Sequence, residues 1–157
     1  MKIGRLLVLF SLILTAGLGA QWQQTSGPAG GSVTDFAALG GHLFVATDGG
    51  GVFRSSDGGV NWTTVNTGLG HTRISGLAAM GDDLFAGSTF GGVFRSADHG
   101  TTWSAVNSGL GNTAVLCLAV SNETLFVGTL YGGVFRSTDR GASWQAANSG
   151  LTNPYIR

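Results

Sequence analysis

The sequence predicts an all-β protein made of repeated four-stranded antiparallel sheets. One phrase occurs three times, as GGVFRSSDGGVNW from residue 50, GGVFRSADHGTTW from residue 91 and GGVFRSTDRGASW from residue 132, with a constant spacing of 41 residues. Each repeat contains four short runs of β-branched and aromatic residues, separated by Gly, Asn, Asp or Ser. No run inside the repeats has the length or the 3.6-residue period of a helix.

Composition limits the size and the partners of this protein. The chain has 157 residues, of which 43% are hydrophobic and 10% charged, which suits one domain. Its 8 basic and 8 acidic residues cancel, so it lacks the basic field that neutralises phosphates, and nucleic acid is not an expected partner. The 28 glycines recur at fixed repeat positions and therefore mark turns.

Residues 1–20 have the features of an export signal. Lys2 and Arg5 precede an apolar run, and small residues lead to Ala20, after which cleavage is expected. The apolar run is shorter than the roughly 18 to 20 residues that a spanning helix needs, so no stable membrane span is expected after cleavage. Position 21 is Gln, which does not fit a lipid-modified cysteine. We expect the mature protein to be secreted, periplasmic or on the cell surface.

The repeat divides the exported chain into units. In the middle unit, the pattern predicts strands at 74–80, 84–88, 92–96 and 102–106. The segment QWQQTSG (21–27) resembles NWTTVNTG from residue 61 with one residue deleted, which predicts a lone outer strand carrying Trp22. The expected order is this strand, three full units, and the start of a further unit, at residues 21–27, 32–68, 73–109, 114–150 and 151–157.

Four strands in about 41 residues suit one blade of a β-propeller, in which such sheets pack around an axis. Three blades are fewer than the usual four to eight. An open array leaves two blade faces in water. If each face has an apolar area on the order of 500 Å², its exposure loses roughly 12 kcal/mol of hydrophobic stabilisation. We therefore expect an incomplete ring that belongs to a longer protein, with further blades in the same chain, or one that closes by self-assembly; the longer protein is the favoured interpretation.

The turn after the third strand of each unit resembles the Asp-box, or BNR, repeat, written S-x-D-x-G-x-T-W. Residues 96–103 match it fully, while Asn61 and Ser143 replace the Thr in the other copies. The resemblance implies a β-propeller fold in which the box residues are structural. It implies no single activity, because the family includes sialidases, xyloglucan-cleaving glycosidases, sorting receptors and photosystem assembly factors. The box residues are Ser55, Asp57, Gly59, Trp62, Ser96, Asp98, Gly100, Trp103, Ser137, Asp139, Gly141 and Trp144.

The loops at the end of the blades opposite the Asp-boxes vary between repeats, and such loops commonly carry function in repeat proteins. Their aromatic side chains can stack on a sugar or a protein side chain, and their polar side chains can supply hydrogen bonds. The competing interpretation is that the aromatic residues fill gaps between blades. The candidate ligand-binding residues are His71, Arg73, Phe90, Asn112, Tyr131 and Tyr155.

The sequence predicts no catalytic residue, metal site or cofactor. A glycosidase needs two carboxyl groups, one with a raised pKa, but Asp82, Asp83 and Glu123 are predicted to be hairpin turn residues. Three arginines, Arg54, Arg95 and Arg136, share one repeat position and therefore belong to different blades, where we expect structural pairing within each blade.

Cys117 is the only cysteine, so no intramolecular disulfide can form. We expect it to be buried in an inner strand, because free cysteine packs as a small hydrophobic residue.

These observations predict an exported, non-enzymatic β-propeller module that binds a protein or a glycan through its variable loops. The alternative is the N-terminal part of a secreted Asp-box glycosidase of the sialidase or xyloglucanase type, with catalytic residues on other blades. An assembly or stability factor, like those of photosystems, is a further possibility that the resemblance alone suggests.

Overall fold

The computed structural model describes residues 27–28 and 30–153, and these contain three four-stranded antiparallel sheets and no helix. The predicted signal peptide, the predicted strand carrying Trp22, and Tyr155 lie outside the described residues. We call the sheets blade 1, blade 2 and blade 3. The strands are, for blade 1, β1 (Val33–Leu39), β2 (His42–Thr47), β3 (Gly51–Ser55) and β4 (Thr63–Thr64); for blade 2, β5 (Ile74–Met80), β6 (Asp83–Ser88), β7 (Gly92–Ser96) and β8 (Ser104–Ala105); and for blade 3, β9 (Val115–Ser121), β10 (Thr124–Thr129), β11 (Gly133–Ser137) and β12 (Gln145–Ala146).

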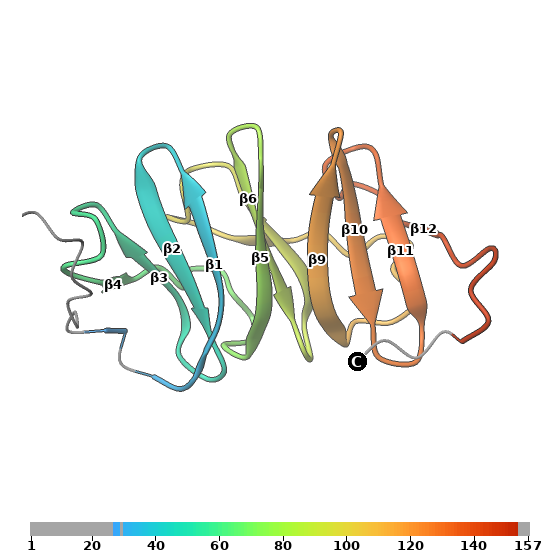
Figure 1. Cartoon of the computed structure of the whole chain (residues 1–157), viewed down its shortest axis with the longest axis horizontal. Helices are drawn as coiled ribbons and strands as arrows, with labels where there is room; N and C mark the ends of the chain where they lie inside the picture. Colours follow the sequence, from blue (N-terminus) through green and yellow to red (C-terminus); the bar gives the residue numbers. More distant parts are fainter. Residues whose placement is uncertain (1–26, 29, 154–157) are drawn as a thin grey trace, which may run out of the picture.

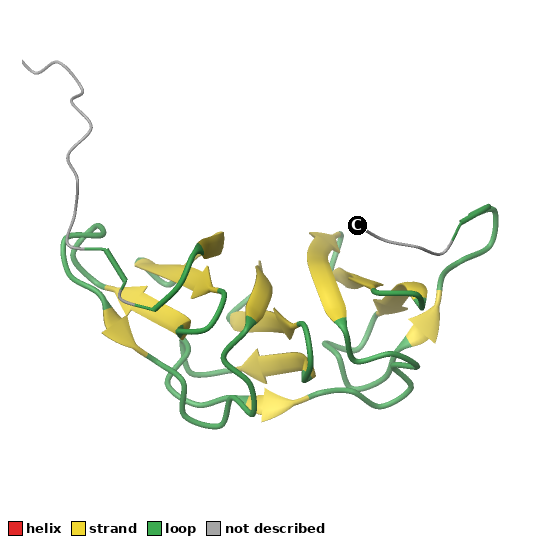
Figure 2. Ribbon diagram, turned by 90° about the horizontal axis from the view of Figure 1, so that it is seen from below, coloured by secondary structure: helices red, strands yellow, loops and turns green. Residues whose placement is uncertain are grey.

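Each blade is a simple meander in which neighbouring strands in the sequence pair side by side. The three blades stand next to one another in chain order, and their hairpins point alternately to two ends of the molecule (Figure 1). A view turned by 90° shows the blades fanned along an open arc (Figure 2). This is the expected blade architecture, and the repeat of 41 residues has therefore been interpreted correctly.

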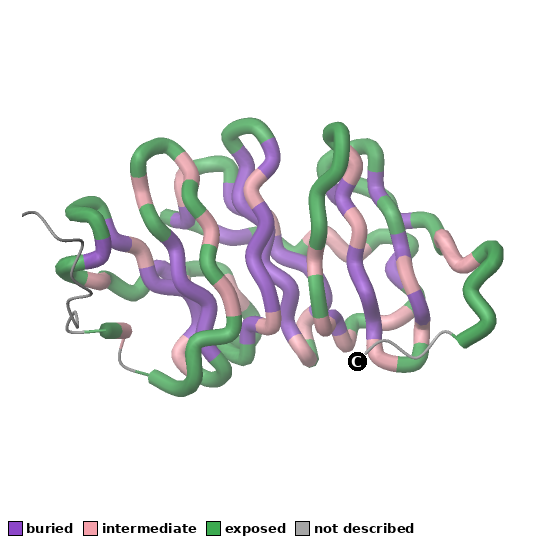
Figure 3. The backbone as a smooth tube through the Cα atoms, in the orientation of Figure 1, coloured by how far each residue is buried: buried purple, intermediate pink, exposed green. Residues whose placement is uncertain are grey.

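The apolar core lies between the blades. Phe44 of blade 1 belongs to one buried cluster with Leu77 and Leu84 of blade 2. The other side of blade 2 contributes Phe85 to a second cluster with Leu125 of blade 3. Blade 2 is thus covered on both sides, and buried positions run along its strands (Figure 3). Each sheet is stabilised mainly by its neighbours, as in other repeat proteins.

A repeated asparagine fixes the chain after each short outer strand. The side chain of Asn107 accepts a hydrogen bond from the Val93 N–H at 2.7 Å and donates one to the Gly91 carbonyl at 3.0 Å. Asn66 and Asn148 make the equivalent pair of bonds in blades 1 and 3. The amide group therefore takes the place of strand pairing where the outer strand has ended.

The prediction for Cys117 was wrong. It lies on an inner strand, β9, as expected, but its side chain is exposed rather than buried. The residues at its repeat position, Asp35 and Gly76, lie on faces that the next blade covers. No described residue covers the corresponding face of blade 3, so the same position is open to solvent there.

Candidate functional site

Two ends of the blades carry different chemistry, and we name them by their residues. The box face carries the three Asp-boxes and the β1–β2, β5–β6 and β9–β10 hairpins. The loop face carries the turns at 48–50, 89–91 and 130–132, together with the connections between blades at 66–73 and 107–114.

The Asp-boxes are closed hydrogen-bonded turns. In blade 2, the Ser96 hydroxyl donates to the Asp98 carboxylate at 2.7 Å and accepts from the Gly100 N–H at 2.8 Å. Asp98 also accepts from the Thr102 N–H at 2.8 Å and from the Thr102 hydroxyl at 2.6 Å. Blades 1 and 3 repeat this network, with Asn61 and Ser143 in place of the threonine.

These hydrogen bonds determine the charge state of the box carboxylates. The bonds from Thr102 lower the pKa of Asp98 from 3.8 to about 2, and the equivalent bonds lower the pKa of Asp57 and Asp139 to about 2. A carboxylate held in this way is stabilised as the anion. A general acid needs the opposite shift, so the box aspartates are suited to turn formation and not to proton donation.

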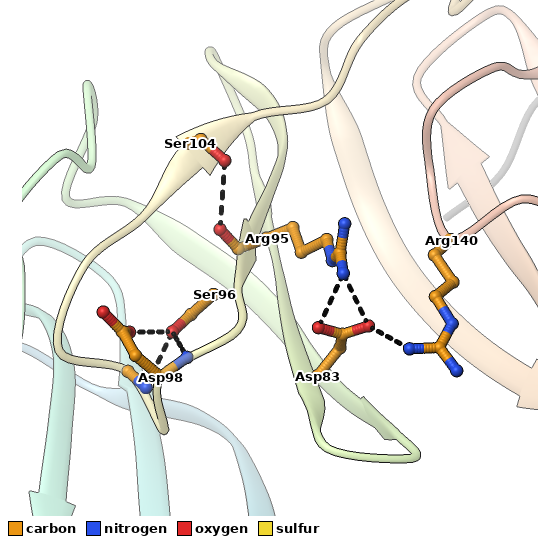
Figure 4. Close-up of polar contacts among 7 residues, drawn as sticks. Asp83, Arg95, Ser96, Asp98, Ser104 and Arg140 are labelled. Carbon is orange, nitrogen blue, oxygen red and sulfur yellow. Dashed lines mark hydrogen bonds and ion pairs between the residues drawn. The ribbon is translucent and has the colours of Figure 1, made fainter.

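Between blades 2 and 3, the box face contains an ion-pair cluster around the buried carboxylate of Asp83 (Figure 4). The guanidinium of Arg95 lies 2.9 Å from Asp83 Oδ1, and Arg140 Nη1 lies 3.0 Å from Asp83 Oδ2. Asp83 is almost completely buried, so it is not the simple turn residue that the sequence suggested. Arg95 pairs within its own blade as predicted, whereas Arg140 belongs to blade 3 and links the two blades.

The prediction that Arg54, Arg95 and Arg136 each pair within their own blade was only partly correct. Arg54 reaches the next blade, where its Nη1 donates to the His99 carbonyl at 3.0 Å, instead of pairing within blade 1. The side chain of Arg136 is exposed and makes no hydrogen bond or ion pair with any residue in the described part of the chain. The three arginines of this repeat position therefore differ: Arg54 contacts the next blade, Arg95 pairs within its own blade, and Arg136 has no partner among the described residues.

On the loop face, Arg73 is the centre of the best-defined candidate site. Backbone bonds from Gly49 and Gly51 to the Thr72 carbonyl, at 3.1 and 2.9 Å, hold the connection from blade 1 to blade 2 against the β2–β3 turn. Arg73 Nε then lies 3.5 Å from Asp48 Oδ1, and both side chains are more than half exposed. This ion pair is long and solvated, so it contributes little to stability.

Arg73 also carries an aromatic neighbour. Its guanidinium carbon lies 5.8 Å from the centre of the Phe90 ring, which is within the range of a cation–π contact. The same arginine borders a shallow depression between blades 1 and 2. The residues that line the depression are Thr34, Asp48, Arg73, Ile74, Ser75 and Thr89.

Tyr131 occupies the position equivalent to Phe90 in the next blade, and the residue is 67% exposed. Its backbone has a φ of 66°, a left-handed conformation that disfavours a bulky side chain. Strain of this kind often lies at functional sites, and an observed outlier is a reason to propose one. Both aromatics are therefore presented to solvent, which argues against the interpretation that they fill gaps between blades.

The remaining predicted ligand residues are less suited to binding. The side chain of Asn112 is occupied, because it donates to the Leu130 carbonyl and accepts from the Ala114 N–H at 2.8 Å. His71 is exposed and packs close to Gly91. Among the described members of the predicted set, the printed contacts bring together Arg73 and Phe90. Asp48, which the sequence analysis did not select, joins them; its position in a variable turn was the available signal.

Residues 27–28 and 30–153 contain no group of three or more His, Cys, Asp or Glu side chains that can hold a metal ion. The same residues contain no helix long and apolar enough to cross a membrane.

Comparison with known proteins places the fold in a family. A model described as the DUF6242 beta propeller domain matches residues 10–108. No curated protein matches the sequence.

Solved structures share the architecture. YCF48 from Cyanidioschyzon merolae is similar with a TM-score of 0.63 and 23% identity over 81% of this chain and 40% of that one. An ancestral GH74 enzyme is similar with a TM-score of 0.61 and 22% identity, over 79% of this chain and 19% of the enzyme. The extracellular domain of the one-component system BT4673 from B. thetaiotaomicron is similar with a TM-score of 0.64 and 17% identity, over 87% of this chain and 19% of that one. The chain therefore spans between 19% and 40% of the length of these proteins, and the likeness shows the fold alone.

Proposed function

We propose that this chain, which belongs to the family of DUF6242 beta-propeller domains, acts by binding, with a polypeptide ligand held on the loop face. The observation that carries this proposal is that Arg73, which lines the depression between blades 1 and 2, lies beside both Asp48 and the ring of Phe90. Exposed aromatic and arginine side chains are the residue types that most often anchor protein interfaces.

Charge favours a polypeptide over a neutral glycan. Arg73 and Asp48 are both exposed and only weakly paired, so a ligand can exchange their mutual contact for its own carboxylate and amide groups. A neutral glycan offers no charge to either side chain. YCF48 has also been solved bound to D1 peptide, which supports peptide binding by a propeller of similar fold.

Hydrolysis of a glycosidic bond is less well supported. That reaction requires a carboxylic acid with a raised pKa beside a second carboxylate. In the box turns, hydrogen bonds instead lower the pKa of Asp57, Asp98 and Asp139. The predicted export signal is consistent with an extracellular binding module, and localisation remains a prediction that fractionation of the source cells can test.

Peptide and glycan arrays, probed with the purified chain, test the proposed function. We expect peptide hits whose affinity falls at least tenfold when Arg73→Ala and Phe90→Ala are combined, because both the charge and the aromatic surface are then lost. Arg136→Ala, which removes an exposed arginine from the box face, is the matched control and should bind normally. Glycan hits alone, or peptide hits unaffected by the double variant, would contradict the proposal.

A further inference from the structure

Blade 1 has an apolar face that no described residue of a neighbouring blade covers. Three repeat positions make this clear, because they are exposed in blade 1 and buried in blade 2. Val33, Phe36 and Leu43 are 45%, 62% and 37% exposed, whereas Ile74, Leu77 and Leu84 are 1%, 5% and 0% exposed. We call Val33, Phe36, Leu43 and Trp62 the first end surface.

Blade 3 has the complementary face. Phe126 and Val134 are partly exposed there, although Phe44, Phe85, Val52 and Val93, at the equivalent positions, are all 0% exposed. Cys117 and Ala119 are exposed beside them. We call Cys117, Ala119, Phe126, Val134 and Gly150 the second end surface.

Inside the molecule, one repeated tryptophan closes each interface between blades. Trp103 of blade 2 donates its indole Nε1–H to the Val65 carbonyl at 2.8 Å and its backbone N–H to the Thr67 carbonyl at 2.9 Å. Trp144 of blade 3 does the same to Val106 and Ser108, at 2.7 and 2.9 Å. Every such interface therefore joins a tryptophan to two carbonyls of the preceding blade.

The same interface requires a glycine. A Cβ atom on Gly68 would lie 2.1 Å from the Trp103 carbonyl oxygen, and one on Gly109 would lie 2.5 Å from that of Trp144. Both glycines have a left-handed φ, at 89° and 81°. Only glycine gives the following tryptophan this close approach.

Within residues 27–28 and 30–153, the two end surfaces hold the unpaired halves of this contact. Trp62 on blade 1 has a buried Nε1 atom with no hydrogen-bond partner among the described residues. On blade 3, Ala147 and Ser149 stand at the repeat positions of the two acceptor carbonyls. Gly150 keeps a φ of 86°, and no atom of the described residues lies within 4 Å of the place where its Cβ would stand.

The acceptor segment of blade 3 is already in the conformation that the interface uses. The Leu151 N–H donates to the Asn148 carbonyl at 3.0 Å, as Leu69 and Leu110 do at the equivalent turns. No reorganisation of this segment is needed before a tryptophan can dock, which lowers the cost of association.

We propose that a second copy of this chain docks here, with the second end surface of each copy against the first end surface of the other. The contact continues the interfaces that already join blades 1, 2 and 3. Two identical contacts related by a twofold axis close a ring of six blades, which is within the range of four to eight seen in propellers. In this contact, the indole N–H and the backbone N–H of Trp62 donate to the carbonyls of Ala147 and Ser149 in the second copy. Arg136 faces Gly58 of the second copy, which occupies the repeat position of His99, just as Arg54 faces His99 within the chain.

One internal contact is not reproduced. Thr34 and Ser75 donate hydroxyl hydrogen bonds to the next blade, at 2.7 Å to the Ile74 carbonyl and 2.7 Å to the Val115 carbonyl. Leu116 replaces them in blade 3. The proposed interface is accordingly more apolar than the internal ones and depends more on Phe36 and Phe126.

Sedimentation velocity of the full chain over a range of concentrations tests the association. We expect a species with twice the chain mass, and we expect Phe36→Asp to shift it to the monomer because a carboxylate is then placed in an apolar interface. Phe90→Asp, at a position 58% exposed on the loop face, is the matched control and should leave the dimer intact. A folded monomer at every concentration would overturn the proposal, as would equal effects of the two substitutions.

A disulfide trap locates the contact and does not depend on affinity. At the interface of blades 2 and 3, a Cβ on Gly76, the repeat equivalent of Cys117, would lie 3.2 Å from Leu118 Cδ1 and 3.5 Å from Leu118 N. Phe36 occupies the position of Leu118, so Phe36→Cys should cross-link to Cys117 of the second copy under mild oxidation. Phe36→Cys with Cys117→Ser, and Phe90→Cys alone, are the controls that should not give this product.

Non-reducing electrophoresis separates the outcomes. A single covalent dimer, with no larger species, supports the closed ring. A ladder of higher multimers would overturn it, because the contact would then propagate as a filament. A chain that stays monomeric and uncross-linked would show that another occupant, such as further blades of a longer chain, takes these surfaces, and would also overturn the proposal.

Discussion

At the scale of single residues, one buried hydroxyl organises each box turn. Ser96 is 1% exposed and connects the Asp98 carboxylate to the Gly100 N–H. In Ser96→Ala, the Gly100 N–H loses its acceptor in a buried site, which should cost about 1 to 3 kcal/mol. Urea unfolding followed by tryptophan fluorescence measures this loss.

The nearby Ser104 is the control for this prediction. Its hydroxyl is exposed and lies 3.5 Å from the Arg95 carbonyl, at the limit of a hydrogen bond. Ser104→Ala should change the free energy of unfolding by less than about 0.5 kcal/mol. Equal effects at the two serines would show that the box network does not stabilise the blade.

The box carboxylates predict how stability depends on pH. Because the pKa of Asp57, Asp98 and Asp139 falls from 3.8 to about 2 on folding, the unfolded chain binds more protons between these values. The stabilisation is complete above about pH 4 and is lost as the pH falls toward 2.

Urea midpoints measured from about pH 5 to about pH 2 check this prediction. Replacement of the three aspartates by asparagine should flatten the decline at the acid end and lower the midpoint at the upper end of this range. Asp82→Asn, at an exposed hairpin position that forms no box turn, should keep the original steepness. If the urea midpoint of the triple variant falls with pH as steeply as that of the parent chain, the three box aspartates are not the cause of the acid decline.

At the scale of elements, the Asp83 cluster joins blade 2 to blade 3. Arg95→Met leaves the buried Asp83 carboxylate with Arg140 alone, which should cost about 1 to 3 kcal/mol. Arg136→Met changes the equivalent residue of blade 3, which has no side-chain partner within the described residues, and should be nearly neutral. Thermal unfolding by circular dichroism compares the two variants, and a larger loss for Arg136→Met would contradict a stabilising role of the Asp83 cluster.

The positions of the inner three strands of the middle blade could be predicted from the sequence, because alternating apolar residues between glycine-rich turns determine where these strands begin and end. The fourth strand was predicted at 102–106 but spans Ser104–Ala105. The backbone N–H of Thr102 donates to the Asp98 carboxylate and that of Trp103 donates to the Thr67 carbonyl of the preceding blade, so neither N–H is available for strand pairing. Side chains that serve the turn and the interface had been assigned to the strand.

Contacts between blades were beyond the reach of sequence analysis. Asp83 and Arg140 are 57 residues apart and occupy unrelated repeat positions, so their pairing has no signal in the period. Cys117 was expected to be buried because its strand is an inner one, but burial of that position depends on the next blade. The Asp48 and Arg73 pair likewise becomes visible only when the connection from blade 1 to blade 2 is placed against the β2–β3 turn.

At the scale of the whole molecule, protection should be greatest in the middle of the arc. All six residues of β6 are buried, because blades 1 and 3 cover both sides of blade 2. The described residues cover one side of blade 1 and one side of blade 3, and the outer strands β4 and β12 of these blades are exposed. Local opening is least costly where few apolar contacts are lost.

Hydrogen exchange measured by mass spectrometry tests this order at concentrations where sedimentation shows the single chain. We expect amides of β6 and β7 to exchange most slowly, those of β2 and β10 at intermediate rates, and those of β4 and β12 fastest. Faster exchange in β6 than in β2 or β10 would contradict stabilisation by neighbouring blades. If the proposed ring forms at higher concentration, both end surfaces become covered, and protection of β2 and β10 should then rise toward that of β6 while β6 itself changes little.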